Sequence, residues 1–173
     1  MTAMNETGSA HWAASGWPGD MPQPRLEFAF RIYVTVGAPI DLGADEVRRR
    51  REVPILGGRV EGPRFSGTVL PGGADHQSVR IADGVATIEA RQTLRHEDGT
   101  VIEMINTGVR RGPPDVLARL AAGEAVDPHD YYFRATPRFV VEPGPHGWLA
   151  DSVFLCVGKR GPAGVELDIH QVL

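Results

Sequence analysis

The stretch VATIEARQTLRHEDGTVIEMINTGV, residues 85–109, decides the fold class of this chain. Apolar and polar residues alternate on both sides of Asp98-Gly99, as they do in half-buried β-strands. Asp-Gly is a strong signal for a two-residue turn, in which both central residues take a positive φ. We therefore expect an antiparallel hairpin of strands 85–95 and 101–109.

The turn position sets which side chains share a face of this hairpin. A turn centred on Asp98-Gly99 would pair Arg91 with Asn106, and Thr93 with Met104. One face then carries the mixed set of Glu89, Arg91, Thr93, Met104 and Asn106. Such a face is either exposed to solvent or lines a barrel whose interior holds a ligand.

The rest of the chain repeats the strand pattern. Aromatic and β-branched runs bounded by Gly, Pro and Asp predict further strands at 26–36, 53–56, 58–60, 64–70, 77–81, 131–139, 148–159 and 165–173. One short helix is expected at Pro114–Ala122, with Gly123 suited to its C-terminal cap. Many short strands, one helix and 21 glycines indicate an all-β sandwich or barrel.

Length and composition predict one globular domain behind a flexible tail. The 173 residues are 42% hydrophobic and 23% charged, which is typical of a soluble domain. Residues 1–24 are rich in Gly, Ser, Ala and Pro and predict a flexible N-terminal tail, so residues 25–173 form the single domain. Trp12 and Trp17 in this tail dock on the barrel or on a neighbouring chain, or are exposed.

Charge and cysteine usage restrict partners and location. The net charge of −4 argues against nucleic acid, and no apolar run approaches the ~18 residues of a membrane helix. The Arg48–Arg51 run is either a solvated loop or edge strand, or part of an anionic-ligand site. Cys156 is the single cysteine and lies in an apolar run, which predicts a buried, inert thiol. We expect a cytoplasmic protein, with a homodimer as the commonest assembly.

The densest polar group is LPGGADHQ, residues 70–77. Gly72-Gly73 can take backbone angles that other residues avoid. Because residues two apart on a strand share a face, Asp75 and Gln77 point the same way while His76 faces away. A carboxylate and an amide aimed together suggest a small-molecule site.

A second polar face lies on the strand around residue 134. Tyr132, Arg134 and Thr136 share it, and an arginine there would bind a carboxylate, enolate or phenolate oxygen. A buried structural ion pair of Arg134 with Glu61 or Asp75 is the alternative. The sequence lacks metal-ligand spacings and the motifs of serine hydrolases, nucleotide-dependent enzymes and nicotinamide enzymes, so we expect no metal and no cofactor.

From about residue 26 to residue 173 the chain resembles a bacterial and fungal family of uncharacterised proteins, domain-of-unknown-function family 3237. The resemblance rests on residues Pro54-Ile55, Gly57-Gly58, Glu61-Gly62-Pro63, Leu70–Asp75, Glu89-Ala90-Arg91, Asp98-Gly99, Asn106, Gly108, Asp127-Pro128, Tyr131–Arg134, Pro137, Phe139 and Trp148-Leu149. It implies a closed antiparallel up-and-down barrel of the lipocalin-like (calycin) kind and no established reaction.

The chain departs from the usual family pattern at four positions. His76 stands where tryptophan is usual, Gln92 replaces a tyrosine, His146 stands near a usual tyrosine, and Ala150 replaces an asparagine. If these positions line the pocket, the exchange of aromatic side chains for His and Gln makes it more polar.

Three functions follow from these residues. The first is a cofactor-free acid–base isomerase, lyase or cyclase for a small oxygenated or aromatic metabolite, in which Asp75 is the base, Arg91 and Arg134 stabilise negative charge, and Tyr132 or His76 returns the proton. The predicted ligand-binding residues are Glu61, His76, Gln77, Met104, Asn106 and Trp148. The second is a non-catalytic barrel that binds a small acid or aromatic compound. The third is a structural protein whose filled barrel holds an ion network.

Overall fold

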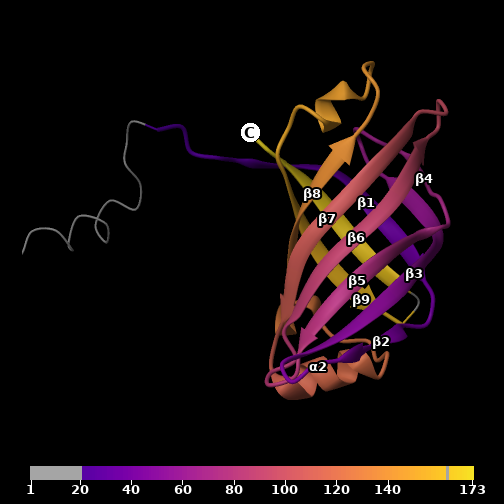
Figure 1. The fold of residues 1–173 in the computed structure, drawn as a ribbon. Helices are drawn as coiled ribbons and strands as arrows, with labels where there is room; N and C mark the ends of the chain where they lie inside the picture. Colours follow the sequence, from indigo (N-terminus) through magenta and orange to yellow (C-terminus); the bar gives the residue numbers. More distant parts are fainter. Residues whose placement is uncertain (1–20, 163) are drawn as a thin grey trace, which may run out of the picture.

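The structure, a computed structural model, describes residues 21–162 and 164–173. Within these ranges all strands belong to one antiparallel sheet (Figure 1). They are β1 (Leu26–Val36), β2 (Ile40–Ala44), β3 (Arg48–Glu61), β4 (Gly67–Val69), β5 (Gly73–Arg80), β6 (Ala86–His96), β7 (Val101–Arg111), β8 (Tyr132–Val140), β9 (Phe154–Gly161) and β10 (Gly164–Val172). The helical elements are α2 (Pro114–Ala121) and the 3₁₀ turns η1 (Pro128–Asp130) and η2 (Gly147–Leu149).

The sheet closes on itself because β1 pairs with β10 on one side and with β3 on the other. β4 and β5 each pair with β3 on one side and β6 on the other, so together they fill one strand position of the barrel. Within the described residues, β2 pairs with β3 alone. The result is a closed eight-stranded barrel with two extra strands and one short helix, which confirms the predicted all-β, up-and-down barrel. Helix α2 lies at one end of the barrel (Figure 1).

Most predicted strands and the predicted helix are present, and their bounds differ where strand pairing or a turn changes them. Strand β3 runs unbroken through 48–61, where two short strands were expected, because both of its edges are paired. The predicted strand 148–159 begins only at Phe154, since η2 occupies the preceding turn. Strand β2, Ile40–Ala44, was missed because its Asp and Gly weaken the strand signal.

The predicted register of the 85–109 hairpin is wrong by one residue. His96 N donates to Thr100 O at 2.9 Å, so the loop has three residues rather than two. Gly99 takes the positive φ of 93°, and no described residue other than glycine has a positive φ. Consequently Ala90 pairs with Asn106, and Gln92 with Met104. A slip of one residue exchanges the two faces, so Asn106 lies opposite the face that carries Arg91.

The apolar core fills the end of the barrel near the β6–β7 turn. Phe30 packs against Phe65 and Phe139 with ring centroids 5.3 and 6.0 Å apart, and Phe139 contacts Phe154 at 5.1 Å. Buried Leu149 of η2 belongs to the same cluster. The other half contains the buried polar residues Gln77, Asn106 and Arg110 among apolar ones, and it is called the polar half below.

Gly72 and Gly73 join β4 to β5, as their sequence predicted for a sharp turn. Gly72 has a φ of 107°, whereas at Gly73 an added Cβ would overlap the carbonyl oxygen of Arg91 and lie 3.1 Å from the Cα of Gln92. We expect Gly73→Ala to lower the free energy of unfolding by about 1–3 kcal/mol, since backbone must move to admit the methyl group.

Chemical denaturation monitored by circular dichroism measures this loss. The matched control is Gly147→Ala, because a Cβ at Gly147 meets no atom within 4 Å. Equal stability of the two variants would show that the contact between β5 and β6 at Gly73 is not close.

The predicted tail with Trp12 and Trp17 lies, up to residue 20, outside the described residues. Among the residues described, no helix combines the length and the hydropathy that a membrane crossing requires. The cytoplasmic location and the homodimer stay predictions.

Candidate functional site

A small cavity of about 40 Å³ lies inside the polar half of the barrel. At ~10–15 Å³ for each water, it has room for roughly three water molecules. Its polar lining residues are Asp75, Gln77, Gln92, Asn106, Arg110 and Arg160, and its apolar ones include Val34, Ile55, Ile88, Phe133 and Leu167. A few polar groups on an apolar wall are typical of small-molecule sites.

Asp75 is held by a hydrogen-bonded relay of three inward-facing side chains. Arg51 on β3 lies opposite Gln77 on β5, and Arg51 Nε donates to Gln77 Oε1 at 2.8 Å. This bond fixes the amide so that Gln77 Nε2 donates to Asp75 Oδ2 at 2.5 Å. The other oxygen, Asp75 Oδ1, is buried and accepts no hydrogen bond among the described residues. One carboxylate oxygen is therefore oriented, and the other is left for a ligand.

Burial raises the pKa of Asp75 above its ordinary 3.8. The hydrogen bond from Gln77 opposes this shift, as do the positive charges of Arg110 and Arg51. A raised pKa makes the ionised form of the carboxyl a better proton acceptor.

Arg110 on β7 is the buried cation of the cavity. Only 7% of the residue is exposed, and no described residue accepts a hydrogen bond from its guanidinium. Burial lowers its pKa to about 10; repulsion from Arg51 and Arg160 acts in the same direction, and Asp75 opposes the change. Arg110 therefore stays protonated at neutral pH, with donors that are free for a ligand.

Two buried amides complete the inner wall. Asn106 Nδ2 contacts the Cys156 sulfur at 3.9 Å, and Asn106 Oδ1 is buried without a hydrogen-bond partner among the described residues. Gln92 Nε2 donates to the Met104 sulfur at 3.1 Å. Sulfur is a weak acceptor, so these amides are only weakly satisfied. Cys156 is buried as predicted, and burial raises the pKa of its thiol to about 12.

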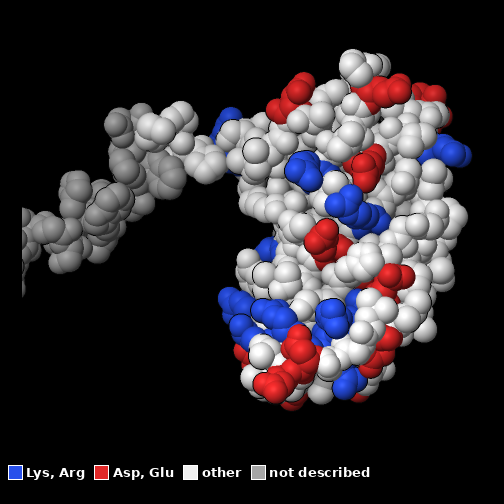
Figure 2. Space-filling view, viewed as in Figure 1, with Lys and Arg blue, Asp and Glu red and all other residues white. Residues whose placement is uncertain are grey.

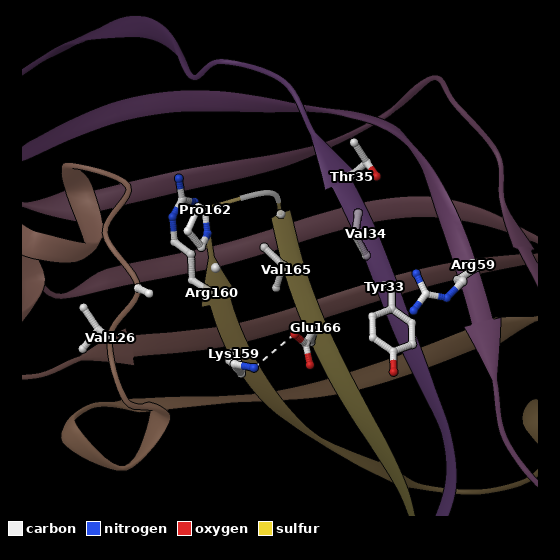
Figure 3. Close-up of a pocket in the computed structure, with 13 residues that line it drawn as sticks. Tyr33, Val34, Thr35, Arg59, Val126, Lys159, Arg160, Pro162, Val165 and Glu166 are labelled. Atoms are coloured by element: carbon white, nitrogen blue, oxygen red, sulfur yellow. Dashed lines mark hydrogen bonds and ion pairs between the residues drawn. The ribbon is translucent and has the colours of Figure 1, made fainter.

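A larger hollow of about 340 Å³ adjoins the cavity beside the turn between β9 and β10 (Figure 3). The two spaces share the lining residues Val34, Arg160 and Val165. On the outer wall Arg59 lies over the Tyr33 ring at 3.7 Å, and Lys159 Nζ is 3.1 Å from Glu166 Oε1. Arg160 thus stands at the boundary between the outer hollow and the inner cavity.

Three of the four predicted catalytic residues are not in the cavity. Arg91 lies on the outer surface between Glu89 and Glu103, at 3.9 and 3.6 Å, because the face of β6 that carries Glu89 and Arg91 is the exposed one. Tyr132 and Arg134 share a face as predicted, but that face is exposed, and Arg134 Nη1 donates to the carbonyl of the adjacent Phe133. The pocket positions predicted for these three residues are wrong.

The predicted ligand-binding residues divide in the same way. Gln77 and Asn106 line the cavity, as does the predicted base Asp75. His76 faces outward, as the alternation predicted, with Nδ1 3.6 Å from Glu52; its expected place at the site is wrong.

The other three lie elsewhere. Glu61 is exposed and pairs with Arg59 at 2.6 Å. Trp148 packs at the apolar end, under the guanidinium of Arg64 at 3.9 Å. Met104 is a fully buried core residue outside the cavity wall, although it contacts Gln92.

Sequence reasoning missed Arg110 and Arg160, and it named Gln92 and Arg51 without assigning them to the site. The signal for Arg110 was present, since it stands four residues after Asn106 on one strand and must share its face. Arg51 belongs to the Arg48–Arg51 run, for which an anionic-ligand site was one interpretation. Alternation placed Gln92 on the face of β6 opposite Arg91, but the one-residue error in register put Asn106 and Met104 on the wrong face, so the inward face was not recognised.

A group of possible metal ligands lies at the end of the barrel that carries the apolar core. His96, Asp98 and His146 place one ligand atom each within 4.8 Å of one another, the one such group found among the described residues. His146 Nε2 is 2.8 Å from Asp98 Oδ2, and His96 Nδ1 is 3.0 Å from Asp98 Oδ1. Sequence spacing did not reveal this group because His146 comes from a distant segment.

The outer surface carries both signs of charge. Figure 2 shows Lys and Arg side chains interspersed with Asp and Glu over the visible face. The cavity differs from this surface, because Arg51, Arg110 and Arg160 repel one another, and Asp75 is the carboxylate that attracts Arg51 and Arg110. The interior therefore carries an excess of positive charge.

Comparison with known proteins places relatives of this chain in bacteria and fungi. The family described as "Protein of unknown function (DUF3237)" matches residues 24–172. A UPF0311 protein of Clostridium acetobutylicum is 39% identical over 154 residues, which cover 88% of this chain and 97% of the relative. A crystal structure of a conserved protein of unknown function from Rhodopseudomonas palustris has a TM-score of 0.84 at 37% identity, covering 88% of this chain and all of that one.

One similar protein has a named activity. A hydroalkoxylation enzyme of Penicillium herquei is 33% identical over 79 residues, or 46% of this chain and 52% of that enzyme. A solved enzyme structure from the same fungus has a TM-score of 0.67 at 20% identity and covers 90% of this chain and all of that one, which shows a shared fold.

Proposed function

The chain belongs to the family of unknown function DUF3237, and within it we propose that the protein is an acid–base enzyme for a small oxygenated or aromatic metabolite. The reaction is of the isomerase, lyase or cyclase type, it takes place in the polar half of the barrel, and it uses the chain's own residues. One observation carries the proposal: Asp75 Oδ1 is buried beside a cavity that Arg110 also lines, and among the described residues neither this oxygen nor the guanidinium has a hydrogen-bond partner.

Each residue has a definite role in the proposed reaction. Ionised Asp75 takes a proton from an O–H, or from a C–H beside a carbonyl. Negative charge then develops on substrate oxygen, where Arg110 stabilises it in a poorly hydrated site. Gln77 and Arg51 hold the carboxylate in one orientation, so they are positioning residues.

The proton must return through Asp75 itself. Tyr132 and His76, the expected proton donors, lie outside the barrel, and the ionisable groups among the described cavity residues are Asp75, Arg110 and Arg160. A raised pKa makes protonated Asp75 a serviceable acid. A single group that takes and returns one proton suits an isomerisation or a ring closure better than a hydrolysis.

The partial relative supports this class of reaction. Hydroalkoxylation adds an alcohol O–H across a C=C bond, so the oxygen loses a proton and a carbon gains one with no net oxidation or reduction; within a single molecule the product is an isomer of the substrate. One carboxyl beside a cation can perform both transfers. This support concerns the type of chemistry and leaves the substrate of this chain open.

A screen for mass-neutral conversion tests the proposal. The protein is incubated with pools of hydroxylated, enolisable and unsaturated aromatic metabolites, and products are followed by chromatography with mass and NMR detection. We expect at least one compound to give an isomer at a rate proportional to protein concentration. Saturable binding with no product over hours would instead support the second candidate, a binding barrel.

The pH dependence of the reaction follows from the shift at Asp75. A general base must be ionised, so kcat/KM rises with pH through the pKa of this group. Because burial raises that pKa, we expect the midpoint of the acid limb above 3.8. Kinetics from pH 3 to 8, with circular dichroism to exclude acid unfolding, measure it. A midpoint at or below 3.8 would contradict a desolvated base.

A further inference from the structure

We infer that the ligand of the inner cavity carries an anionic oxygen group, a carboxylate or a phenolate, which binds the guanidinium of Arg110. The inference rests on the proposed function for the statement that this ligand is a substrate. It adds the charge of the substrate and the residue that recognises it.

The first step is the state of Arg110. A guanidinium has five N–H donors, and a buried one normally binds carboxylates, carbonyls or water. Arg110 lines the cavity, is 7% exposed, and has no hydrogen-bond acceptor among the described residues. A buried charged group whose donors have no acceptor is costly, so a ligand that supplies acceptors to Arg110 binds favourably.

The second step is the count of charges around it. Arg51, Arg110 and Arg160 interact electrostatically with one another, and Asp75 is the carboxylate that acts on this group. Asp75 attracts Arg110, but its hydrogen bond comes from Gln77, so the guanidinium of Arg110 has no hydrogen bond to this carboxylate. Even with Asp75 ionised, three cations face one anion, and an anionic ligand reduces the imbalance where a neutral one does not.

The third step is the placement of the ligand. Asp75 would repel an anionic group, so that group lies on Arg110 and Arg160, and a neutral part of the molecule with its acidic proton faces Asp75 Oδ1. Arg160 and Val165 line both the cavity and the outer hollow. An aromatic body larger than the inner cavity therefore extends past Arg160 into the hollow of about 340 Å³.

Matched ligand pairs test the inference on the whole protein. Benzoate is compared with benzamide, acetate with acetamide, and 4-nitrophenolate with neutral nitrobenzene, by NMR titration at low salt. We expect the anions to bind saturably and about tenfold or more tightly than their neutral partners, as for a hydrogen bond to a charged group. The carboxylate and phenolate arms identify which oxygen group the site prefers. If no anion is preferred over its neutral partner, the inference is wrong.

Two variants locate the preference. Arg110→Met keeps the volume and removes the charge, and it should lose the tenfold preference. Arg91→Met removes an arginine whose side chain is 56% exposed on the outer face, and it should bind like the wild type. Equal loss in both variants, or no loss in Arg110→Met, would overturn the assignment. If Arg110→Met does not fold, Arg110→Lys and the wild-type pairs decide.

The outcome separates this inference from the proposed function. If the protein prefers anions through Arg110 but Asp75→Asn keeps full turnover, the anion-binding site stands and Asp75 is not the base. If Asp75→Asn loses turnover but the protein shows no preference for anions, Asp75 stands as the base and the inference that the substrate is anionic is wrong.

Discussion

Replacing Asp75 by asparagine is expected to reduce kcat by about 10²–10⁴-fold on any substrate that the protein converts, the usual contribution of a general base. Asparagine keeps the shape of the side chain and can still accept the hydrogen bond from Gln77. It cannot take a proton at any pH of interest, so the loss falls on kcat while KM changes little. Steady-state kinetics of the two purified proteins measure the ratio.

The control for this change is Glu89→Gln on the neighbouring strand. Glu89 pairs with His76 in the register of β5 and β6, and its side chain is 55% exposed on the outer face. It should leave kcat within twofold of the wild type. If Asp75→Asn retains full turnover, or if Glu89→Gln loses as much, Asp75 is not the base.

The second large effect concerns stability. We expect Phe30→Ala to lower the free energy of unfolding by about 3–5 kcal/mol, the cost of removing a buried aromatic ring from a close-packed core. Phe30 is fully buried, and its ring contacts Phe65 and Phe139. Urea unfolding with an unchanged slope gives the difference directly.

Phe28→Ala is the matched control, because Phe28 lies two residues earlier on β1 and is 39% exposed. Its loss should be much smaller, although its ring contacts His170 edge-on at 5.7 Å. Equal losses would mean that the core of the barrel is not centred on Phe30. Since this core lies in the half away from the cavity, Phe30→Ala should leave the pH profile of the proposed reaction unchanged in the protein that remains folded.

Alternation in the sequence was enough to place most strands and to divide β8 into its two faces. It could not tell which face was inward, because Tyr132, Arg134 and Thr136 would suit a polar lumen as well as a wet surface. Closure decides this point, since Phe133 and Ala135 pack into the barrel. The family resemblance, and not the alternation, gave the closed barrel.

The site was harder to predict because it depends on register and on distant pairings. Asp75 and Gln77 were found from spacing alone, since one strand carries both. A two-residue turn placed Met104 and Asn106 on the face of Arg91, whereas the three-residue loop places them on the opposite face. The pairing of Arg51 with Gln77 joins segments that sequence patterns do not connect.

The crystal structure of Asp75→Asn with a converted substrate tests the central claim most directly, because the inactive variant retains the unreacted molecule. We predict that the acidic O–H or C–H lies within about 2.6–3.2 Å of the side chain at position 75, with an anionic oxygen on the guanidinium of Arg110. A substrate bound wholly in the outer hollow between Tyr33 and Glu166, or on the outer face beside Arg91 and Arg134, would contradict the account.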